Sequence, residues 1–333
     1  PPSVLYSSIV TEFPFNAYSR YLKRIYGERV YRIGVDGGFS CPNRSSDRRW
    51  GGCTFCDESG ARSAYIADHE AADLRGQIER SRKVLGRRYG ARSFILYFQA
   101  FSGTYAPVPR LRQIYDHALS LAPFRELIVG TRPDCVDAET ASLLGSYRRA
   151  AAATAGERAP AVEDVWVELG LQSAHDRTLE RIRRGHDVAA FDRALSVLRA
   201  EGVRTAAHVI HGLPGEGREE FLQTVQYLAE RRIEGIKIHN LHVVSGTSLA
   251  AEYAAGAFSV PDAEEHVEAV ASALELLPPE TVVMRMTCDT SSERLIAPRS
   301  FPDKQQFRRR LVSYMEEHGM YQARRYCAAV QAR

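Results

Sequence analysis

Short apolar runs alternate with amphipathic stretches between residues 30 and 240 of this 333-residue chain. The apolar runs are rich in Val, Ile and aromatic residues, are too short for helices, and span residues 30–35, 93–98, 126–129, 164–169, 205–210 and 235–238. The stretches between them have helical periodicity, and Gly202 ends one of them in the position of a helix C-cap glycine. Six consecutive strand–helix units predict an α/β fold, a partial (β/α)6 barrel of parallel strands.

The regularity weakens toward both ends of the chain. We expect an N-terminal extension over residues 1–29, the partial barrel over residues 30–246, and a mixed helical C-terminal region over residues 247–333 that covers the barrel mouth. Helices are expected over residues 262–277 and 302–318, and a further strand-like run spans residues 281–287. The alanine-rich segment 150–161 is expected to be a frayed helix end that continues into a mobile loop.

Composition sets few limits on function. The chain is 44% hydrophobic and 26% charged, ordinary values for a globular protein, and its net charge of +3 favours no particular partner. No apolar run approaches the roughly 18 residues of a membrane span, and no signal peptide is evident. We therefore expect a soluble cytoplasmic protein without a membrane partner.

A cysteine loop over residues 36–57 carries most of the chemical information. Cys41, Cys53 and Cys56 are spaced C-x11-C-x2-C. Three thiolates can hold an iron–sulfur cluster and leave one iron open for a substrate or cofactor. The same C-x2-C pair is typical of structural zinc, for which His69 is the nearest histidine. A disulfide is also compatible with the spacing, and the spacing alone leaves these alternatives open.

Polar residues follow each expected strand, where chemistry is located in parallel barrels. Among them, Glu168 is a candidate general base or a carboxylate that pairs with Arg132 or Arg184, and pairing is the preferred interpretation. Four histidines near strand ends are either metal ligands or hydrogen-bonded structural groups: His208, His211, His239 and His242.

Taken together, several motifs resemble the radical S-adenosylmethionine (SAM) superfamily, and within it the YhcC/YtqA-like group, relatives of the radical domain of the elongator acetyltransferase subunit. The resemblance covers roughly residues 18–300 in register. The matching motifs are Asp36-Gly37-Gly38-Phe39-Ser40-Cys41-Pro42-Asn43-Arg44, Gly51-Gly52-Cys53-Thr54-Phe55-Cys56, Tyr97-Phe98-Gln99-Ala100, Gly130-Thr131-Arg132-Pro133-Asp134, Trp166-Val167-Glu168-Leu169-Gly170-Leu171-Gln172-Ser173, Arg184-Gly185-His186-Asp187 and His208-Val209-Ile210-His211-Gly212-Leu213-Pro214.

This resemblance implies a radical SAM barrel in which Cys41, Cys53 and Cys56 bind a [4Fe-4S] cluster and SAM chelates the fourth iron. One electron, from a donor such as flavodoxin or ferredoxin, then cleaves SAM to a 5′-deoxyadenosyl radical that abstracts a substrate hydrogen. The resemblance also implies SAM contacts from residues at the strand ends, namely Gln99, Thr131, Glu168, Gln172, Arg184, His208 and Leu213.

Two features depart from the group's pattern. Cys288 stands where a glycine is expected, and the stretch after Pro298 lacks the usual aromatic-containing sequence. Cys288 is interpreted either as a buried small apolar residue or as a group that faces the substrate.

The kinship of the group with tRNA-modifying enzymes implies an RNA substrate, such as a wobble uridine. Two arginine clusters, the second with interleaved tyrosines, fit phosphate and base contacts: Arg80, Arg82, Arg87 and Arg88, and Arg308, Arg309, Arg310, Arg324 and Arg325 with Tyr314, Tyr321 and Tyr326. The alternatives are a radical SAM enzyme that acts on a small metabolite or peptide, and a non-catalytic metal-binding module.

Overall fold

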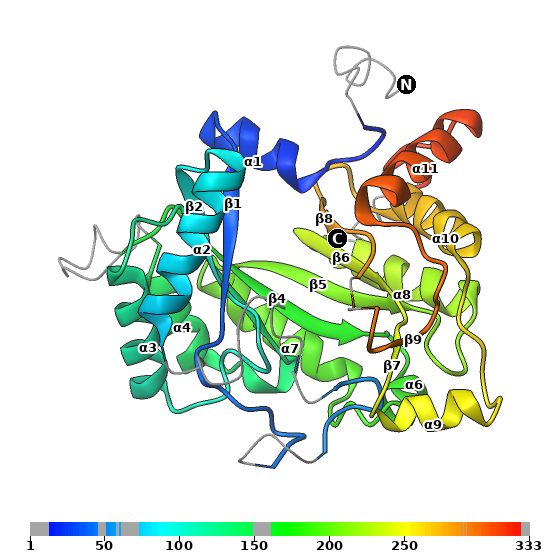
Figure 1. Ribbon diagram of the computed structural model, residues 1–333, viewed down its shortest axis with the longest axis horizontal. Coiled ribbons are helices and arrows are strands. Elements are labelled where there is room, and N and C mark those ends of the chain that lie inside the picture. Colours follow the sequence, from blue (N-terminus) through cyan, green and yellow to red (C-terminus); the bar gives the residue numbers. More distant parts are fainter. Residues whose placement is uncertain are drawn as a thin grey trace, which may run out of the picture.

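The computed structural model describes residues 13–45, 51–57, 60, 73–148, 161–288, 290 and 292–327. Its centre is a curled sheet of seven strands in the order β1-β2-β3-β4-β5-β6-β8, and every neighbouring pair is parallel (Figure 1). The strands are β1 (Val30–Val35), β2 (Ser93–Phe98), β3 (Glu126–Thr131), β4 (Asp164–Gln172), β5 (Arg204–His211), β6 (Gly235–Asn240) and β8 (Val282–Arg285).

Helices cover the outer face of this sheet. They are α2 (Leu74–Tyr89), α3 (Val108–Ser120), α4 (Ala138–Ser146), α7 (Val188–Ala200), α8 (Arg218–Glu230) and α10 (Ala263–Leu276). Strands β2, β3 and β4 are buried along their whole length, which is why their sequences are mostly apolar on both faces and do not alternate regularly. Their buried charged residues include Glu126 and Glu168. The main hydrophobic core lies between the sheet and these helices.

A second apolar cluster lies on the inner face of the curled sheet, next to α1. Helix α1 (Tyr18–Tyr26) closes the amino-terminal end of the barrel, and its Tyr18 and Tyr21 pack in one cluster with Trp166 of β4. Tyr21 meets the Trp166 ring edge-on, with 5.9 Å between ring centroids. The N-terminal segment is therefore part of the barrel interior.

The remaining elements lie around the carboxyl ends of the strands and beside α10. Two short strands, β7 (Val243–Val244) and β9 (Leu295–Ala297), pair antiparallel. The short helices are η2 (Pro133–Cys135), α6 (Asp176–Arg181) and α9 (Ser248–Ala254), and α11 (Lys304–Glu317) packs against α10.

The predicted α/β class and parallel partial barrel are confirmed. The expected strands at residues 30–35 and 93–98 match β1 and β2, whereas β3 to β6 extend beyond the expected ends by one to three residues. A seventh strand, β8, joins the predicted six, because the run at residues 281–287 pairs with β6. The three-part domain division stays a prediction, and segment 150–160 lies outside the described residues.

Helix ends follow the sequence signals. The helix predicted around Phe191 ends before Gly202, which adopts a φ of +67°, and Asp187 caps its start by accepting from the Ala190 N–H. Among the described residues, no helix is both long and apolar enough to cross a membrane.

Candidate active site at the carboxyl ends of the strands

In the loop after β1, Arg44 contacts two of the three cysteines, and Asn43 donates to the sulfur of the third, Cys53, at 3.7 Å. Arg44 donates its backbone N–H to the Cys41 carbonyl at 2.9 Å, and its guanidinium donates to the Cys56 sulfur at 3.2 Å. The Cys56 N–H donates to the Cys53 carbonyl at 3.0 Å. Gly51 allows the tight return of the loop, because its φ is +86° and a Cβ there would lie 2.4 Å from the Asn43 carbonyl oxygen.

The loop is anchored to elements far away in the sequence. Asn43 donates its side-chain amide to the carbonyls of Arg183 and Arg184, each at 2.9 Å. Thr54 is held on both sides, because its N–H donates to the Ile182 carbonyl and its carbonyl accepts from the Leu249 N–H at the start of α9, both at 3.0 Å. The position of the cysteines therefore depends on the turn after α6 and on the C-terminal region.

Three guanidiniums surround the thiols. Arg184 donates to the Cys53 sulfur at 3.4 Å. Although burial lowers the pKa of Arg132, its contact with Asp134 and the nearby Cys41 and Cys53 raise it above its ordinary value. Burial raises the pKa of the Cys56 thiol, and the Arg44 charge opposes this increase.

The residues around the cysteines limit which metal group the loop can hold. In the described part of the chain, no three Cys, His, Asp or Glu side chains lie close enough together to hold one metal ion. His69, which the zinc alternative would need, lies outside the described residues. The three sulfurs with cations beside them fit a metal-bound thiolate site such as a cluster, because positive charge next to a thiol opposes the effect of burial and favours the thiolate form.

Strand β4 ends in a polar group that reaches the cysteine loop. Arg184 donates from Nη2 and Nε to the Gly170 carbonyl, at 2.8 and 3.2 Å, while its Nη1 contacts Cys53. A bulge follows Gly170, and Gln172 adopts a positive φ of 73°. The sequence predicted Gln172 and Arg184 as a functional pair, and the structure brings both side chains to Gly170.

Glu168 lies deeper, on the inner face of the barrel, with 1% of its surface exposed. It pairs with Lys237 of β6, lies 3.5 Å from Arg32 of β1, and accepts from the Tyr97 hydroxyl at 2.6 Å. Although burial would raise its pKa, the charges of Lys237 and Arg32 lower it well below its ordinary value.

The expected pairing of Glu168 with Arg132 or Arg184 is wrong, since Arg132 binds Asp134 in a bidentate pair at 2.7 and 2.8 Å. Sequence reasoning missed Arg32, Tyr97 and Lys237 as partners of Glu168. The available signal was a charged residue in the middle of each of two short apolar strands, at positions that alternate to the inner face.

The four strand-end histidines take part in separate contacts. His208 lies 3.1 Å from Glu168, His211 lies 3.0 Å from His266, and His242 lies 2.8 Å from Thr290. The His239 ring lies 5.4 Å from that of His208. No metal site forms from them within the described residues.

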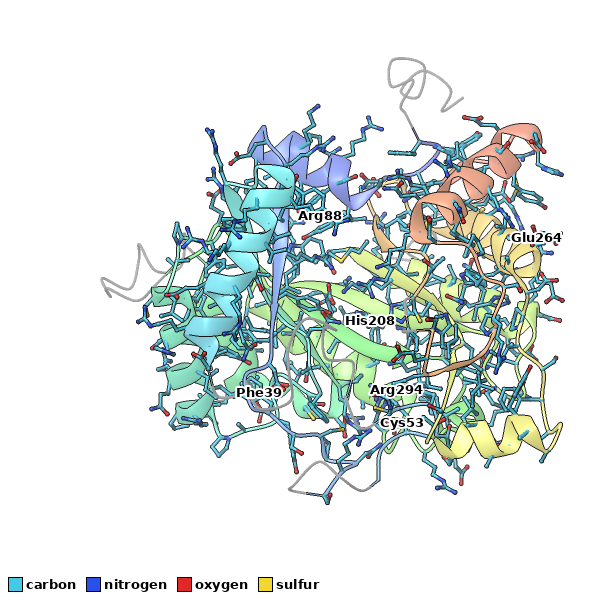
Figure 2. The ribbon with its side chains drawn as sticks, viewed as in Figure 1. Phe39, Cys53, Arg88, His208, Glu264 and Arg294 are labelled. Carbon is cyan, nitrogen blue, oxygen red and sulfur yellow. The ribbon has the colours of Figure 1, made fainter. Side chains whose placement is uncertain are left out.

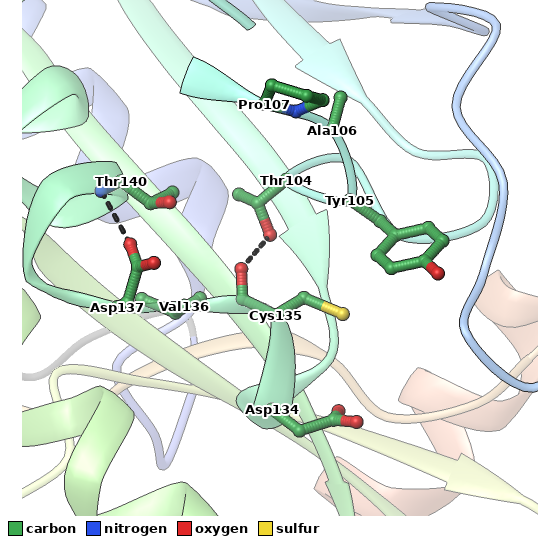
Figure 3. A pocket seen from close by; sticks show the side chains of 9 residues that line it. All are labelled: Thr104, Tyr105, Ala106, Pro107, Asp134, Cys135, Val136, Asp137 and Thr140. Atoms are coloured by element: carbon green, nitrogen blue, oxygen red, sulfur yellow. Dashed lines mark hydrogen bonds between the residues drawn. The ribbon is translucent and has the colours of Figure 1, made fainter.

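Polar residues after β2 and β3 border a surface pocket of about 510 Å³ (Figure 3). The Thr131 hydroxyl lies 2.6 Å from the Thr104 hydroxyl, which in turn donates to the Cys135 carbonyl. Burial raises the pKa of the Cys135 thiol to about 12, so this cysteine stays protonated. Gln99 directly follows β2 and is half-buried.

Leu213, a predicted SAM contact, and Cys288, predicted to be either buried or substrate-facing, differ in burial. Leu213 is 1% exposed and packs in an apolar cluster with Ile210 and Leu241. Cys288 is half-buried beyond the end of β8, where its N–H donates to Asn240, so it is not a core residue.

Comparison with known families decides the identity of this arrangement. The profile of the Radical SAM superfamily matches residues 48–228, and that of the Radical_SAM C-terminal domain matches residues 233–317. The chain belongs to the radical SAM superfamily. It is a radical SAM enzyme, as the motifs predicted.

The relatives support membership of the YhcC/YtqA-like group. Protein YhcC of Escherichia coli (strain K12) is 37% identical over 305 residues, which are 92% of this chain and 93% of YhcC. YtqA of Bacillus subtilis (strain 168) is 33% identical over 314 residues, 94% of this chain and 93% of YtqA. A tRNA uridine(34) acetyltransferase of Methanocaldococcus jannaschii is 26% identical over 157 residues, 46% of this chain and 28% of that protein.

The fold has a solved counterpart. The structure of archaeal Methanocaldococcus infernus Elp3 superimposes with a TM-score of 0.64 at 17% sequence identity, covering 88% of this chain and 64% of that one. This similarity confirms the fold of the radical SAM enzyme described above.

Proposed function

We propose that the cysteine loop binds a [4Fe-4S] cluster through Cys41, Cys53 and Cys56, and that SAM binds beside it. The observation that carries this proposal is that Arg44 contacts Cys41 and Cys56 while Arg184 donates to Cys53. With one electron from an external donor, the bound cluster would cleave SAM to methionine and a 5′-deoxyadenosyl radical, which would abstract a substrate hydrogen. Arg44, Arg132 and Arg184 stabilise the thiolates, and Asn43 fixes the loop against the turn after α6.

We infer SAM contacts from seven residues, and their support differs. Gln172 and Arg184 are supported by their place around Gly170, next to Cys53. Gln99 is supported by its position directly after β2, and His208 and Glu168 by their place on the inner face of the barrel. The Thr131 hydroxyl already has a partner in Thr104, and Leu213 offers only apolar contact.

The test is anaerobic reconstitution with iron and sulfide. The protein should become brown, bind about four irons per chain and release 5′-deoxyadenosine when SAM and a reductant are added. Cys53→Ala should abolish both properties, because two thiolates cannot hold the cubane. Cys327→Ala, a change at an exposed cysteine, is the matched control and should leave both unchanged. A colourless protein that binds zinc stoichiometrically would refute the proposal.

For the substrate we propose tRNA as one candidate, supported by the partial match to a tRNA uridine(34) acetyltransferase. Binding would then weaken steeply with salt, because phosphate contacts release counterions. Changing Arg308, Arg309 and Arg310 to Ala should flatten that dependence if α11 contacts the RNA. The absence of tRNA binding at low salt, by the reconstituted protein with SAM, would exclude this candidate.

A small-molecule substrate is the second candidate, and the position of the basic clusters favours it. Arg88 of α2 and Glu264, the partner of Arg310, lie toward the α1 end of the molecule, whereas Cys53 lies at the opposite end (Figure 2). Arg324 also has a carboxylate partner, Glu275, at 3.3 Å. The clusters therefore lie away from the cysteine loop, and part of their charge is neutralised.

A further inference from the structure

A layer of polar side chains lies inside the barrel, between the apolar cluster next to α1 and the cysteine loop. Gly170, His208, Lys237 and Arg285 occupy one register row across β4, β5, β6 and β8. Arg32 of β1 and Tyr97 of β2 complete the layer, since Arg32 lies over the Tyr97 ring and Lys237 donates to the Tyr97 hydroxyl at 3.1 Å. His208 lies at mid-height between the two ends of the molecule (Figure 2).

Positive charge exceeds negative charge in this layer. Arg32, Lys237 and Arg285 are opposed by one carboxylate, Glu168, which already binds Lys237, Tyr97 and His208. Glu126, the next carboxylate toward α1, accepts hydrogen bonds from the hydroxyls of Tyr18 and Tyr26 of α1, at 3.0 and 2.8 Å. The layer therefore carries net positive charge, and Glu168 Oε1, 3.5 Å from Arg32 Nη1, is its one carboxylate oxygen without a hydrogen bond from a described residue.

Hydrogen-bond donors are left over as well. The side chain of the half-buried Arg285 has no hydrogen bond or ion pair with any described residue. Arg32 lies 3.5 Å from Glu168 and over the Tyr18 ring, but its buried Nε and Nη2 have no acceptor of good geometry in the described part of the chain, and Nε2 of His239 likewise has no partner there. Partly buried charges and donors without partners are costly, so a partner such as an anion or an ordered water would stabilise them.

The layer remains open to solvent and adjoins the cysteine loop. The side chains of Arg32 and His208 are 21% and 19% exposed although they lie on the inner face of the barrel. Arg184 connects Cys53 to Gly170, and Gly170 begins the register row that ends at Arg285. Three strand spacings separate Gly170 from Arg285, roughly 14 Å along the curved sheet. A small molecule held at Arg285 could therefore extend toward the cysteine loop.

We propose that Arg285, Arg32 and His239 bind the carboxylate or phosphate group of a small-molecule substrate. The guanidiniums would form charge-assisted hydrogen bonds to the anionic oxygens, and His239 would donate a further one. Burial, with smaller contributions from Arg285 and His208, lowers the pKa of His239 well below its ordinary value, so its neutral ring offers one donor and one acceptor. This inference rests on the proposed function, because it names the class of substrate that the same barrel receives.

The test measures anion binding directly, on protein that has not been reconstituted, so that its result does not depend on a cluster. Orthophosphate and acetate are titrated separately at constant ionic strength, and binding is followed by calorimetry and by the increase in unfolding temperature that a ligand of the native state produces. Saturable binding of either anion to the wild-type protein supports the proposal. The anion that binds more tightly indicates whether the substrate group is a phosphate or a carboxylate. Absence of binding of both anions overturns it.

Variants locate the site. Arg285→Gln should weaken binding of the preferred anion about tenfold or more, the effect of losing a charged hydrogen-bond partner. Without anion, its unfolding temperature should equal or exceed that of the wild-type protein, because an unpaired charge has been removed. Arg112→Gln, at an exposed position on α3 outside both arginine clusters, is the matched control and should bind as the wild-type protein does. Unchanged binding by Arg285→Gln, or a lower unfolding temperature with binding retained, overturns the proposal.

Competition with SAM tests whether the bound anion occupies a substrate site or the site of the SAM carboxylate. In reconstituted protein, the anion should still bind at Arg285 when SAM is saturating, although His208 and Glu168 of the same layer are proposed SAM contacts. Displacement of the anion by SAM would assign the layer to the cofactor and overturn the proposal. A protein that binds anions but forms no cluster would fail the proposed function while leaving the anion site intact, so the two failures are distinguishable.

Discussion

Gly170 shows how one residue couples the barrel to the cysteine loop. Its carbonyl accepts two hydrogen bonds from Arg184, and a Cβ at this position would lie 2.4 Å from Arg184 Nη2. Only a residue without a side chain leaves room for a guanidinium that also contacts Cys53.

Gly170→Ala should therefore displace Arg184 and the support that it gives to Cys53. We expect a loss of stability of about 1–3 kcal/mol, as for other overpacked interiors, and reduced 5′-deoxyadenosine release. Urea unfolding and product release measure the two effects. Gly86→Ala in α2 is the matched control, since the nearest atom would be 3.9 Å away and alanine should stabilise the helix by about 0.5–1 kcal/mol. Equal behaviour of the two variants would contradict this role of Gly170.

At the scale of elements, Glu126 connects β3 to α1. Burial raises the pKa of Glu126 to about 7, despite the hydrogen bonds from Tyr26 and Tyr18 that lower it. The folded protein therefore binds a proton that the unfolded chain has already released above its ordinary pKa of 4.5. Stability from this group is fully present below pH 4.5, decreases as pH rises toward 7, and changes little above that.

Glu126→Gln should remove this pH dependence. Between pH 4.5 and 7 the wild-type free energy of unfolding should fall by up to about 3 kcal/mol from this group, whereas the variant should change less. Hydrogen exchange in α1 should become faster in the wild-type protein over the same interval, because Tyr18 and Tyr26 bind this carboxyl. Glu168 affects stability in a different pH range. Because its pKa is lowered, its contribution to the free energy of unfolding decreases only below pH 4.5. Parallel pH profiles of the wild-type protein and the variant would contradict the prediction.

The same elements indicate what the sequence could and could not predict. Apolar runs placed all six expected strands, because parallel strands buried on both faces are mostly apolar, with few charged residues. Strand β8 is short and has two half-buried residues, so its pattern did not reveal that it joins the sheet. Arg184 was predicted from its motif, but its contacts with Cys53 and Gly170 depend on the turn after α6, which local patterns do not specify. The partners of Glu168 come from four other strands, and only the register of the whole sheet brings them together.

At the scale of the whole molecule, the barrel is completed by residues that follow the predicted boundary at 246. Strand β8 covers the edge of β6, and α10 packs against α8. The N–H of Leu249 at the start of α9 holds Thr54 of the cysteine loop. Val283 of β8 also forms a parallel bridge with Ala17, and its N–H donates to the Asn16 carbonyl at 2.9 Å, so the segment before α1 pairs with the edge strand of the sheet.

A chain that ends at residue 246 should consequently not fold as an independent unit. The exposed edge of β6 and the uncovered side of α8 would favour aggregation, and the cysteine loop would lose its contact with α9. The full-length protein should unfold in one transition that circular dichroism and tryptophan fluorescence follow together, because Trp166 lies in the shared interior. Co-expression of residues 247–333 as a separate chain should restore solubility and reconstitution, since it returns β8 and α10. A soluble fragment of residues 1–246 with its own cooperative transition would instead make the C-terminal region a separate domain that merely covers the mouth.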